Sequence, residues 1–260
     1  MPIDRRTLYP PTDRPLLEGG PFEAGFIALH PFFVVDGLNP ALADYGTIVI
    51  QRDSHRDESV AELIEEAEVS RHEGNVATDE VEFLAKTRGR PIRWSEVAAV
   101  TGIPNFSALN RALLTSIGAL KPEFQDSKSA ELLRSYCRAN RVFMPTEGAI
   151  QPMMERGIAA LLKTAGLDRA ELASEFDATG VDVNVSELEV DAPWEIAGNP
   201  RSISRIYAPD RSLLVAVDWD SFFTLIAGTH ERLRRSEVES AFEGFPCSSE
   251  TRHDWWHQNA

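Results

Sequence analysis

Hydrophobic and polar residues alternate in a strand-like way near both ends of the chain. Close to the start, residues 26–35 and 45–51 are rich in β-branched and aromatic side chains, and turn-forming residues at 36–40 separate them. Near the other end the same texture returns at 181–185, 202–207 and 212–217. These segments predict strands, whereas 222–227 is compatible with either a strand or a helix.

The middle of the chain follows a helical period instead. Within 57–70, Val60, Leu63, Ile64 and Ala67 recur at helical spacing, and acidic residues fill the opposite face. Further helices are predicted at 79–87, 95–100, 107–117, 129–140, 153–165 and 168–176, with a closing helix at 231–242.

This order of elements predicts an α+β fold. The N- and C-terminal strands are expected to form one sheet around a mainly helical middle. Because the chain has no internal repeat and no low-complexity linker, residues 1–260 are expected to form a single domain. Residues 1–22 are polar and rich in proline, which predicts an extended N-terminal arm. A helical insert is expected over 79–176, and it contains a helix pair at 94–118.

The net charge of −15 is concentrated in two segments. Residues 57–82 hold ten acids and one arginine, a net charge of −9, and residues 168–195 hold nine acids and one arginine, a net charge of −8. Residues 86–141 carry a net charge of +6. The molecule is therefore expected to be bipolar, with acidic faces that attract a basic partner and repel nucleic acid at long range. The alternative is that both acidic runs are only solvated helix surface or loop.

The cysteines and the hydropathy of the chain indicate its cellular location. Cys137 and Cys247 lack the spacing of a disulfide framework or a thiolate metal site, which favours a reducing environment. The N-terminus has no signal-peptide pattern, and the longest apolar stretch, 24–35, is far shorter than the ~20 residues that span a bilayer. We therefore expect a cytoplasmic protein without a membrane partner.

Residues 94–118 have the pattern of a helix-turn-helix. A first helix ends near Gly102, and Asn105 or Ser107 can cap a second helix with a side-chain oxygen. The segment resembles the second DNA-binding unit of the AraC-type transcription regulators. The resemblance rests on Val97-Ala98, Gly102-Ile103, Ser107, Asn110-Arg111 and Gly118.

This resemblance implies DNA binding through polar and basic side chains on and around the second helix. The candidates are Arg90, Arg93, Ser107, Asn110, Arg111 and Lys121. Arg111 is the only base on that helix, and the alternative is a structural helix pair whose core is Val97, Leu109, Leu113 and Ile117.

The C-terminal tail contains two histidines at helical spacing. His253 and His257 are four residues apart, which on a helix places both imidazoles on one face, as a metal pair requires. Glu250, Asp254 or Cys247 could supply a third ligand. The alternative is that these histidines pack or hydrogen-bond within a tryptophan-rich tail.

A third group of candidates surrounds a strand end. Asp218, Trp219 and Asp220 follow a buried strand, and a carboxylate pair there could hold a cation or raise one pKa, with His30 as a further pocket candidate. The alternatives are a plain turn or helix cap for the acids and a hydrogen-bonded core position for His30. The chain has no GxSxG, GxGxxG, GxxxxGK[ST] or HExxH motif, so no catalytic residue is assigned.

Four longer segments show a resemblance that spans most of the chain. They read PFEAGFIALHPFFVV, residues 102–118, VDWDSFFTLIAG and EGFPCSSETRHDWW. Together they are similar to a family of uncharacterised bacterial proteins known from bacilli and their relatives. The resemblance implies a single full-length domain of bacterial origin, and because that family has no assigned activity, it assigns no catalytic residues to this chain.

These observations favour binding over catalysis. We expect a protein-binding module, similar in function to an immunity protein or antitoxin, that uses acidic surfaces against a basic protein and needs no cofactor. One alternative is a DNA-binding regulator that uses the 94–118 segment. The other is a metal-dependent hydrolase, which a deep pocket joining Asp218, Asp220 and a histidine would favour.

Overall fold

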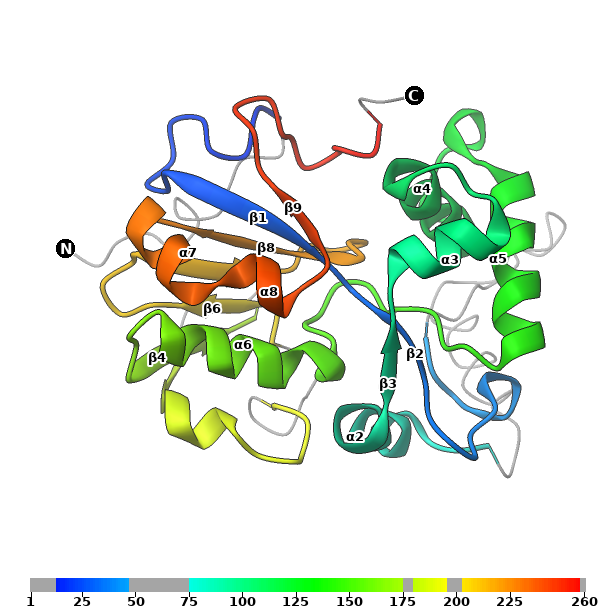
Figure 1. The fold of residues 1–260 in the computed structure, drawn as a ribbon, viewed down its shortest axis with the longest axis horizontal. Helices are drawn as coiled ribbons and strands as arrows, with labels where there is room; N and C mark the ends of the chain where they lie inside the picture. Colours follow the sequence, from blue (N-terminus) through cyan, green and yellow to red (C-terminus); the bar gives the residue numbers. More distant parts are fainter. Residues whose placement is uncertain (1–12, 47–74, 175–179, 196–202, 258–260) are drawn as a thin grey trace, which may run out of the picture.

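The computed structural model describes residues 13–46, 75–174, 180–195 and 203–257. These residues form a seven-stranded antiparallel sheet with the strand order β5-β4-β6-β7-β8-β1-β9 (Figure 1). The strands are β1 (Ala24–Leu29), β4 (Arg169–Ala173), β5 (Val181–Asn184), β6 (Arg205–Tyr207), β7 (Leu213–Ala216), β8 (Phe223–Gly228) and β9 (Gly244–Pro246). Strand β1 pairs with both β8 and β9. The α+β fold, with N- and C-terminal strands in one sheet, is therefore confirmed.

One face of the sheet packs against helices. In β7, Leu213 and Val215 belong to the same buried cluster as Ile158 and Leu162 of α6 (Pro152–Thr164). Two short helices, α7 (His230–Ser236) and α8 (Val238–Ala241), lie beside α6 on this face (Figure 1). The period-two alternation of β7 thus sends every second side chain toward these helices.

The opposite set of strand side chains joins a second core. Leu214 of β7 and Leu225 of β8 share it with Trp94 and Leu113 from a helical group beside the sheet (Figure 1). That group consists of α3 (Trp94–Thr101), α4 (Phe106–Ser116) and α5 (Ser127–Asn140). Trp255 of the C-terminal tail is buried in the same core. Sheet, helical group and tail are therefore held together by one continuous apolar cluster.

A two-stranded sheet and helix α2 connect the seven-stranded sheet with the helical group. Strand β2 (Phe32–Val34) pairs with β3 (Arg90–Ile92), and helix α2 (Thr78–Arg88) precedes β3. Short 3-10 turns occupy Pro40–Leu42, Pro122–Phe124 and Val185–Leu188. The rings of Phe33 and Phe143 stack with centroids 4.8 Å apart.

Several sequence predictions are corrected by the structure. The predicted strand 26–35 is two strands, because it is interrupted at His30-Pro31 and Pro31 lacks the N–H that a continuous ladder requires. The predicted helix 168–176 is wrong, since residues 169–173 form β4. Their alanine, glutamate and leucine favour a helix, but pairing with β5 and β6 overrides that preference. The closing helix 231–242 is broken at Glu237, where φ is +50°.

Other predictions agree with the structure or concern residues outside the described ranges. Residues 223–227 of the 222–227 segment belong to strand β8 (Phe223–Gly228), and the helix pair of 94–118 is present as α3 and α4. The predicted helix 57–70 and most of the strand 45–51 lie outside the described residues. Within the arm, the described residues 13–22 pack onto the molecule: Leu16 and Phe22 are buried, and the Leu16 amide donates to the Thr251 carbonyl at 2.8 Å. In the described ranges, no helix has both the length and the apolar character to cross a bilayer.

Candidate functional site

The structure brings Asp218 and His253 together. His253 Nε2 lies 3.0 Å from Asp218 Oδ2 and 3.3 Å from Ser221 Oγ. Asp218 and Ser221 come from the turn between β7 and β8, and His253 comes from the C-terminal tail. The two side chains that sequence analysis assigned to separate candidate sites are therefore partners.

This cluster lacks the arrangement of a serine nucleophile. In a catalytic triad the carboxylate holds Nδ1, which leaves Nε2 to accept the serine proton. Here Asp218 occupies Nε2, the same nitrogen that faces Ser221, and the serine itself is 2% exposed. The contacts therefore favour a role in fastening the tail to the β7–β8 turn.

The other residues of the predicted pocket are more dispersed. Asp220 has φ of +58°, and both burial and the neighbouring charge of Asp218 raise its pKa. Trp219 is 65% exposed. The 217–222 segment is thus a tight turn, as in the structural alternative considered for these acids.

His30 is a fully buried, hydrogen-bonded histidine. Its Nδ1–H donates to the Thr146 carbonyl at 3.0 Å, so its Nε2 accepts from the Thr224 hydroxyl at 2.9 Å. Burial lowers the pKa of His30 to about 4, against the Thr146 hydrogen bond, which raises it. His30 is therefore neutral at physiological pH and stands apart from the Asp218–His253 pair.

The tail histidines do not share a helical face. Residues 253–257 form turns, so the four-residue spacing no longer places both rings together. The His257 ring packs edge-on against Phe124 with centroids 5.0 Å apart, while His253 faces Asp218. Among the described residues, no three or more histidine, cysteine, aspartate and glutamate side chains are grouped as a metal site.

The helix pair buries the side chains that would read DNA. Ser107 and Asn110 are 9% and 1% exposed, and every residue of α4 is at least partly buried. Arg111 lies close enough to Asp126 to lower the pKa of that carboxyl, although the hydrogen bond from the Ser129 amide lowers it more. A recognition helix needs an exposed face, so the packing favours the structural alternative for this pair.

The remaining basic candidates are exposed on separate elements. Arg90 lies in β3, Arg93 precedes α3, and Lys121 precedes the 3-10 turn at Pro122–Phe124. Whether they contact nucleic acid stays a prediction.

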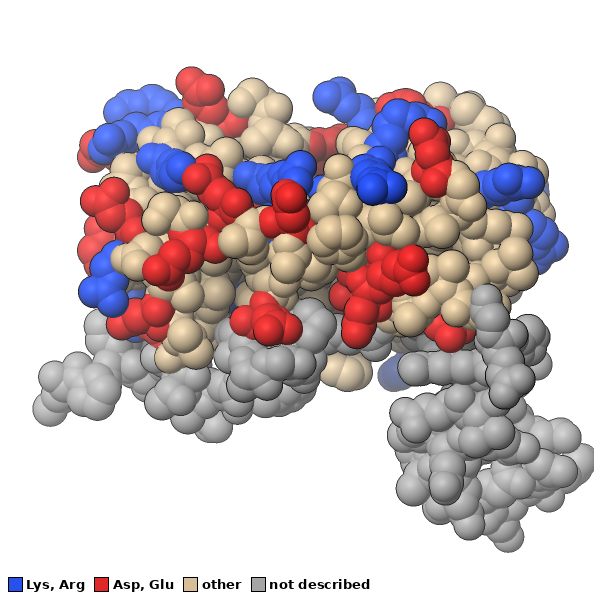
Figure 2. Space-filling model, turned by 90° about the horizontal axis from the view of Figure 1, so that it is seen from below, with Lys and Arg blue, Asp and Glu red and all other residues tan. Residues whose placement is uncertain are grey.

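The second acidic segment is partly neutralised by ion pairs. Asp191 pairs with Arg156 at 2.7 Å, Glu189 with Lys163 at 2.5 Å, and Asp182 with Arg169 at 3.4 Å. On the face drawn in Figure 2, acidic and basic side chains are interspersed. Most of the first acidic segment, by contrast, lies outside the described residues. The described surface therefore offers a basic partner less uncompensated charge than the sequence alone indicates.

A buried ion pair that sequence analysis missed joins α2 to α6. Lys86 Nζ lies 2.5 Å from Glu155 Oε2 and 2.6 Å from the Ala192 carbonyl, and the Trp194 amide donates to the same carboxylate at 3.1 Å. Burial raises the pKa of Glu155 to about 7, although Lys86 acts in the opposite direction. Because all these groups are mutually hydrogen-bonded, the cluster is a structural connection.

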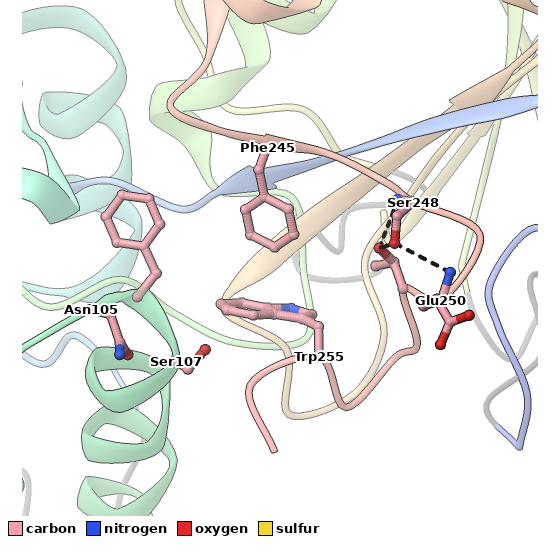
Figure 3. Close-up of a pocket in the computed structure, with 8 residues that line it drawn as sticks. Asn105, Ser107, Phe245, Ser248, Glu250 and Trp255 are labelled. Carbon is pink, nitrogen blue, oxygen red and sulfur yellow. Dashed lines mark hydrogen bonds between the residues drawn. The ribbon is translucent and has the colours of Figure 1, made fainter. Parts of the chain in front are cut away.

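Two cavities remain as candidate sites. The first, here called the tail groove, has a volume of about 500 Å³ and lies between the start of α4 and the C-terminal tail (Figure 3). Its wall consists of Asn105, Phe106, Ser107, Phe245, Ser248, Glu250, Thr251 and Trp255. In Figure 3, Asn105 and Ser107 lie on one side of Trp255 and Phe245, and Ser248 and Glu250 lie on the other.

The second, here called the arginine cavity, has a volume of about 340 Å³. Helices α4 and α5 form one side of it, and the segments 39–46 and 142–145 form the other. Its apolar wall includes Leu113, Ile117, Val142 and Phe143, and its charged side chains are Arg134 and Arg138.

Comparison with known families gives a match over most of the chain. A family model described as "Protein of unknown function (DUF2711)" matches residues 13–257. The chain belongs to the DUF2711 family. The expected membership in a family of unknown function is confirmed, while the match does not address bacterial origin or the AraC-type resemblance. No curated protein and no solved structure matches this DUF2711 protein.

Sequence reasoning recognised neither cavity of the DUF2711 protein, although it named two residues of the tail groove, Ser107 and Glu250, as candidates for other sites. The wall of the arginine cavity comes from four separate stretches of the chain, which no local motif could connect. The one signal available was the positive charge of 86–141, the segment to which Arg134 and Arg138 belong.

Proposed function

We propose that this DUF2711 protein is a non-catalytic binding protein that holds a small amphipathic anion in the arginine cavity. The observation that carries the proposal is a contrast of charge. The chain has a net charge of −15, yet the described residues of this cavity wall include two arginines and no carboxylate.

The size and lining of the cavity suit an apolar ligand body. Its volume of about 340 Å³ falls within the roughly 300–1,000 Å³ typical of small-molecule sites. Leu113, Ile117, Val142 and Phe143 would cover such a body, which gains about 25 cal/mol for each Å² of apolar surface removed from water.

The two arginines suit an anionic head group. A guanidinium offers planar N–H donors that match a carboxylate or phosphate. Arg138 is exposed and forms no ion pair with a described residue. Arg134 pairs with Glu131 at 2.9 Å, but that glutamate is 61% exposed, so a ligand could replace it at little cost.

Calorimetric titration with octanoate tests the proposal. Octanoate combines an eight-carbon chain with a carboxylate, while 1-octanol and octylammonium carry the same chain with a neutral or cationic head. We expect octanoate to bind most tightly. Replacing Arg138 with glutamine should weaken octanoate binding about tenfold through loss of a charge-assisted hydrogen bond.

Lys128→Gln provides the matched control, because Lys128 is an exposed base on the same helix but is absent from the cavity wall. This variant should bind octanoate like the unaltered protein. Equal affinity for octanoate and 1-octanol, or an equal loss in both variants, would contradict an anion site.

We also keep two sequence expectations as proposals. One is a basic protein partner for the acidic residues of 57–82, which a salt-sensitive pulldown would reveal. The other is a reducing, cytoplasmic location. This location is supported by Cys137 and Cys247, which are both free thiols. Burial raises the pKa of each thiol to about 12.

A further inference from the structure

We infer that the tail groove is a second binding site, one that takes a small organic cation. This inference goes beyond the proposed function, because the groove and the arginine cavity share no wall residue. The groove also has the opposite charge character.

Aromatic rings form the apolar part of the groove. Phe245 and Trp255 have ring centroids 5.0 Å apart and an interplanar angle of 73°, so their faces point in different directions (Figure 3). Phe106 adds a third ring to the wall. The faces of aromatic rings attract cations placed within about 6 Å of the centroid, and tryptophan does so best.

The groove carries a single charged side chain, and it is acidic. Glu250 is exposed and has no ion pair with a described residue, so its charge remains available. A local network holds the backbone at Glu250: the Glu250 amide donates to Ser248 Oγ at 3.2 Å, and the Ser248 amide donates to Thr251 Oγ1 at 2.9 Å. Because the described residues of the wall include no lysine or arginine, none of them competes for the carboxylate.

The far side of the groove provides neutral hydrogen-bonding groups. Asn105, a wall residue of the groove, accepts from the Ala108 amide through Oδ1 at 2.9 Å, and its side-chain NH₂ is a hydrogen-bond donor. Ser107 adds a hydroxyl on the same side (Figure 3). The wall therefore matches a small organic cation whose ammonium lies against the rings and near Glu250, and the class is an amino alcohol or its quaternary form.

Titration with choline tests the inference. Choline carries a quaternary ammonium and a hydroxyl, and 3,3-dimethyl-1-butanol is its uncharged isostere. We expect choline to bind and the isostere to bind at least about tenfold more weakly, since it lacks both the attraction to the rings and that to Glu250. Glu250→Gln should weaken choline binding about tenfold. Glu239→Gln, which removes an exposed acid of α8, should leave choline binding unchanged.

The same titration separates this inference from the proposed function. Arg138→Gln should not alter choline binding, because Arg138 lies outside the groove. Absence of choline binding, equal binding of the uncharged isostere, or an equal effect of Glu250→Gln and Glu239→Gln would each overturn the inference, whatever the result with octanoate.

Discussion

At the scale of single residues, burial decides what the titratable side chains can do. His30 lies within apolar strand sequence, and its two ring nitrogens are both hydrogen-bonded. Its sequence context was sufficient to indicate a core histidine, because apolar neighbours on both sides imply burial. The Asp218–His253 contact was beyond such reasoning, since only the folded tail brings these residues together.

The pKa of His30 predicts a dependence of stability on pH. The folded pKa is lowered from 6.5 to about 4, so below pH 6.5 the unfolded chain binds a proton that the folded chain does not. Burial of neutral His30 therefore contributes its full share to the free energy of unfolding above pH 6.5. As pH falls from 6.5 toward 4, that free energy should decrease by on the order of 3 kcal/mol.

Urea denaturation between pH 4 and 7 measures this loss. His30→Gln keeps a donor and an acceptor but cannot titrate, so its unfolding free energy should fall less steeply over the same range. Parallel curves for the two proteins would show that His30 is not the source.

At the scale of elements, strand and helix periods predicted most segments, and the failures have physical reasons. Residues 169–173 contain good helix formers, yet hydrogen bonding to two neighbouring strands makes them β4. Strand β9 is three residues long and includes Gly244 and Pro246, so its pattern is too short to detect. Long-range caps are equally invisible: the Glu243 carboxylate accepts from the Trp94 and Ser95 amides at the start of α3.

The buried pair between α2 and α6 yields an element-scale prediction. Lys86→Met leaves the Glu155 carboxylate buried without its cation, and we expect a loss of about 3–5 kcal/mol in unfolding free energy. The double variant Lys86→Met with Glu155→Gln should recover much of that loss, because no uncompensated charge remains and the glutamine oxygen still accepts from Trp194. Chemical denaturation of the three proteins measures the difference. If the double variant is the least stable, the pair is net stabilising.

At the scale of the whole molecule, the α+β class and the shared sheet of N- and C-terminal strands followed from strand-like texture at both ends of the chain. The two cavities did not, because their walls combine side chains from distant segments. The C-terminal tail closes the structure: Trp255 is buried in the shared core, while His253 and Asp218 are partly exposed.

The tail should therefore be anchored by Trp255 more than by the contact between His253 and Asp218. Trp255→Ala should cost about 3–5 kcal/mol through the cavity it leaves. His253→Ala should cost about 1 kcal/mol, as expected for the loss of one partly exposed hydrogen-bonded contact. Limited proteolysis of the tail, combined with thermal unfolding, checks both values. If His253→Ala lowers stability more than Trp255→Ala does, the contact with the β7–β8 turn is the main attachment of the tail.

Strand β1 sits between β8 and β9, its two partners, which follow it by about 200 residues. On the ribosome, at about 5–20 residues per second, Phe26 and Ile27 would wait roughly 10–40 s for those partners to be synthesised. Throughout that interval the nascent chain presents an apolar strand with unpaired edges. Biogenesis of this protein should accordingly depend on chaperones that shield such strands until translation ends.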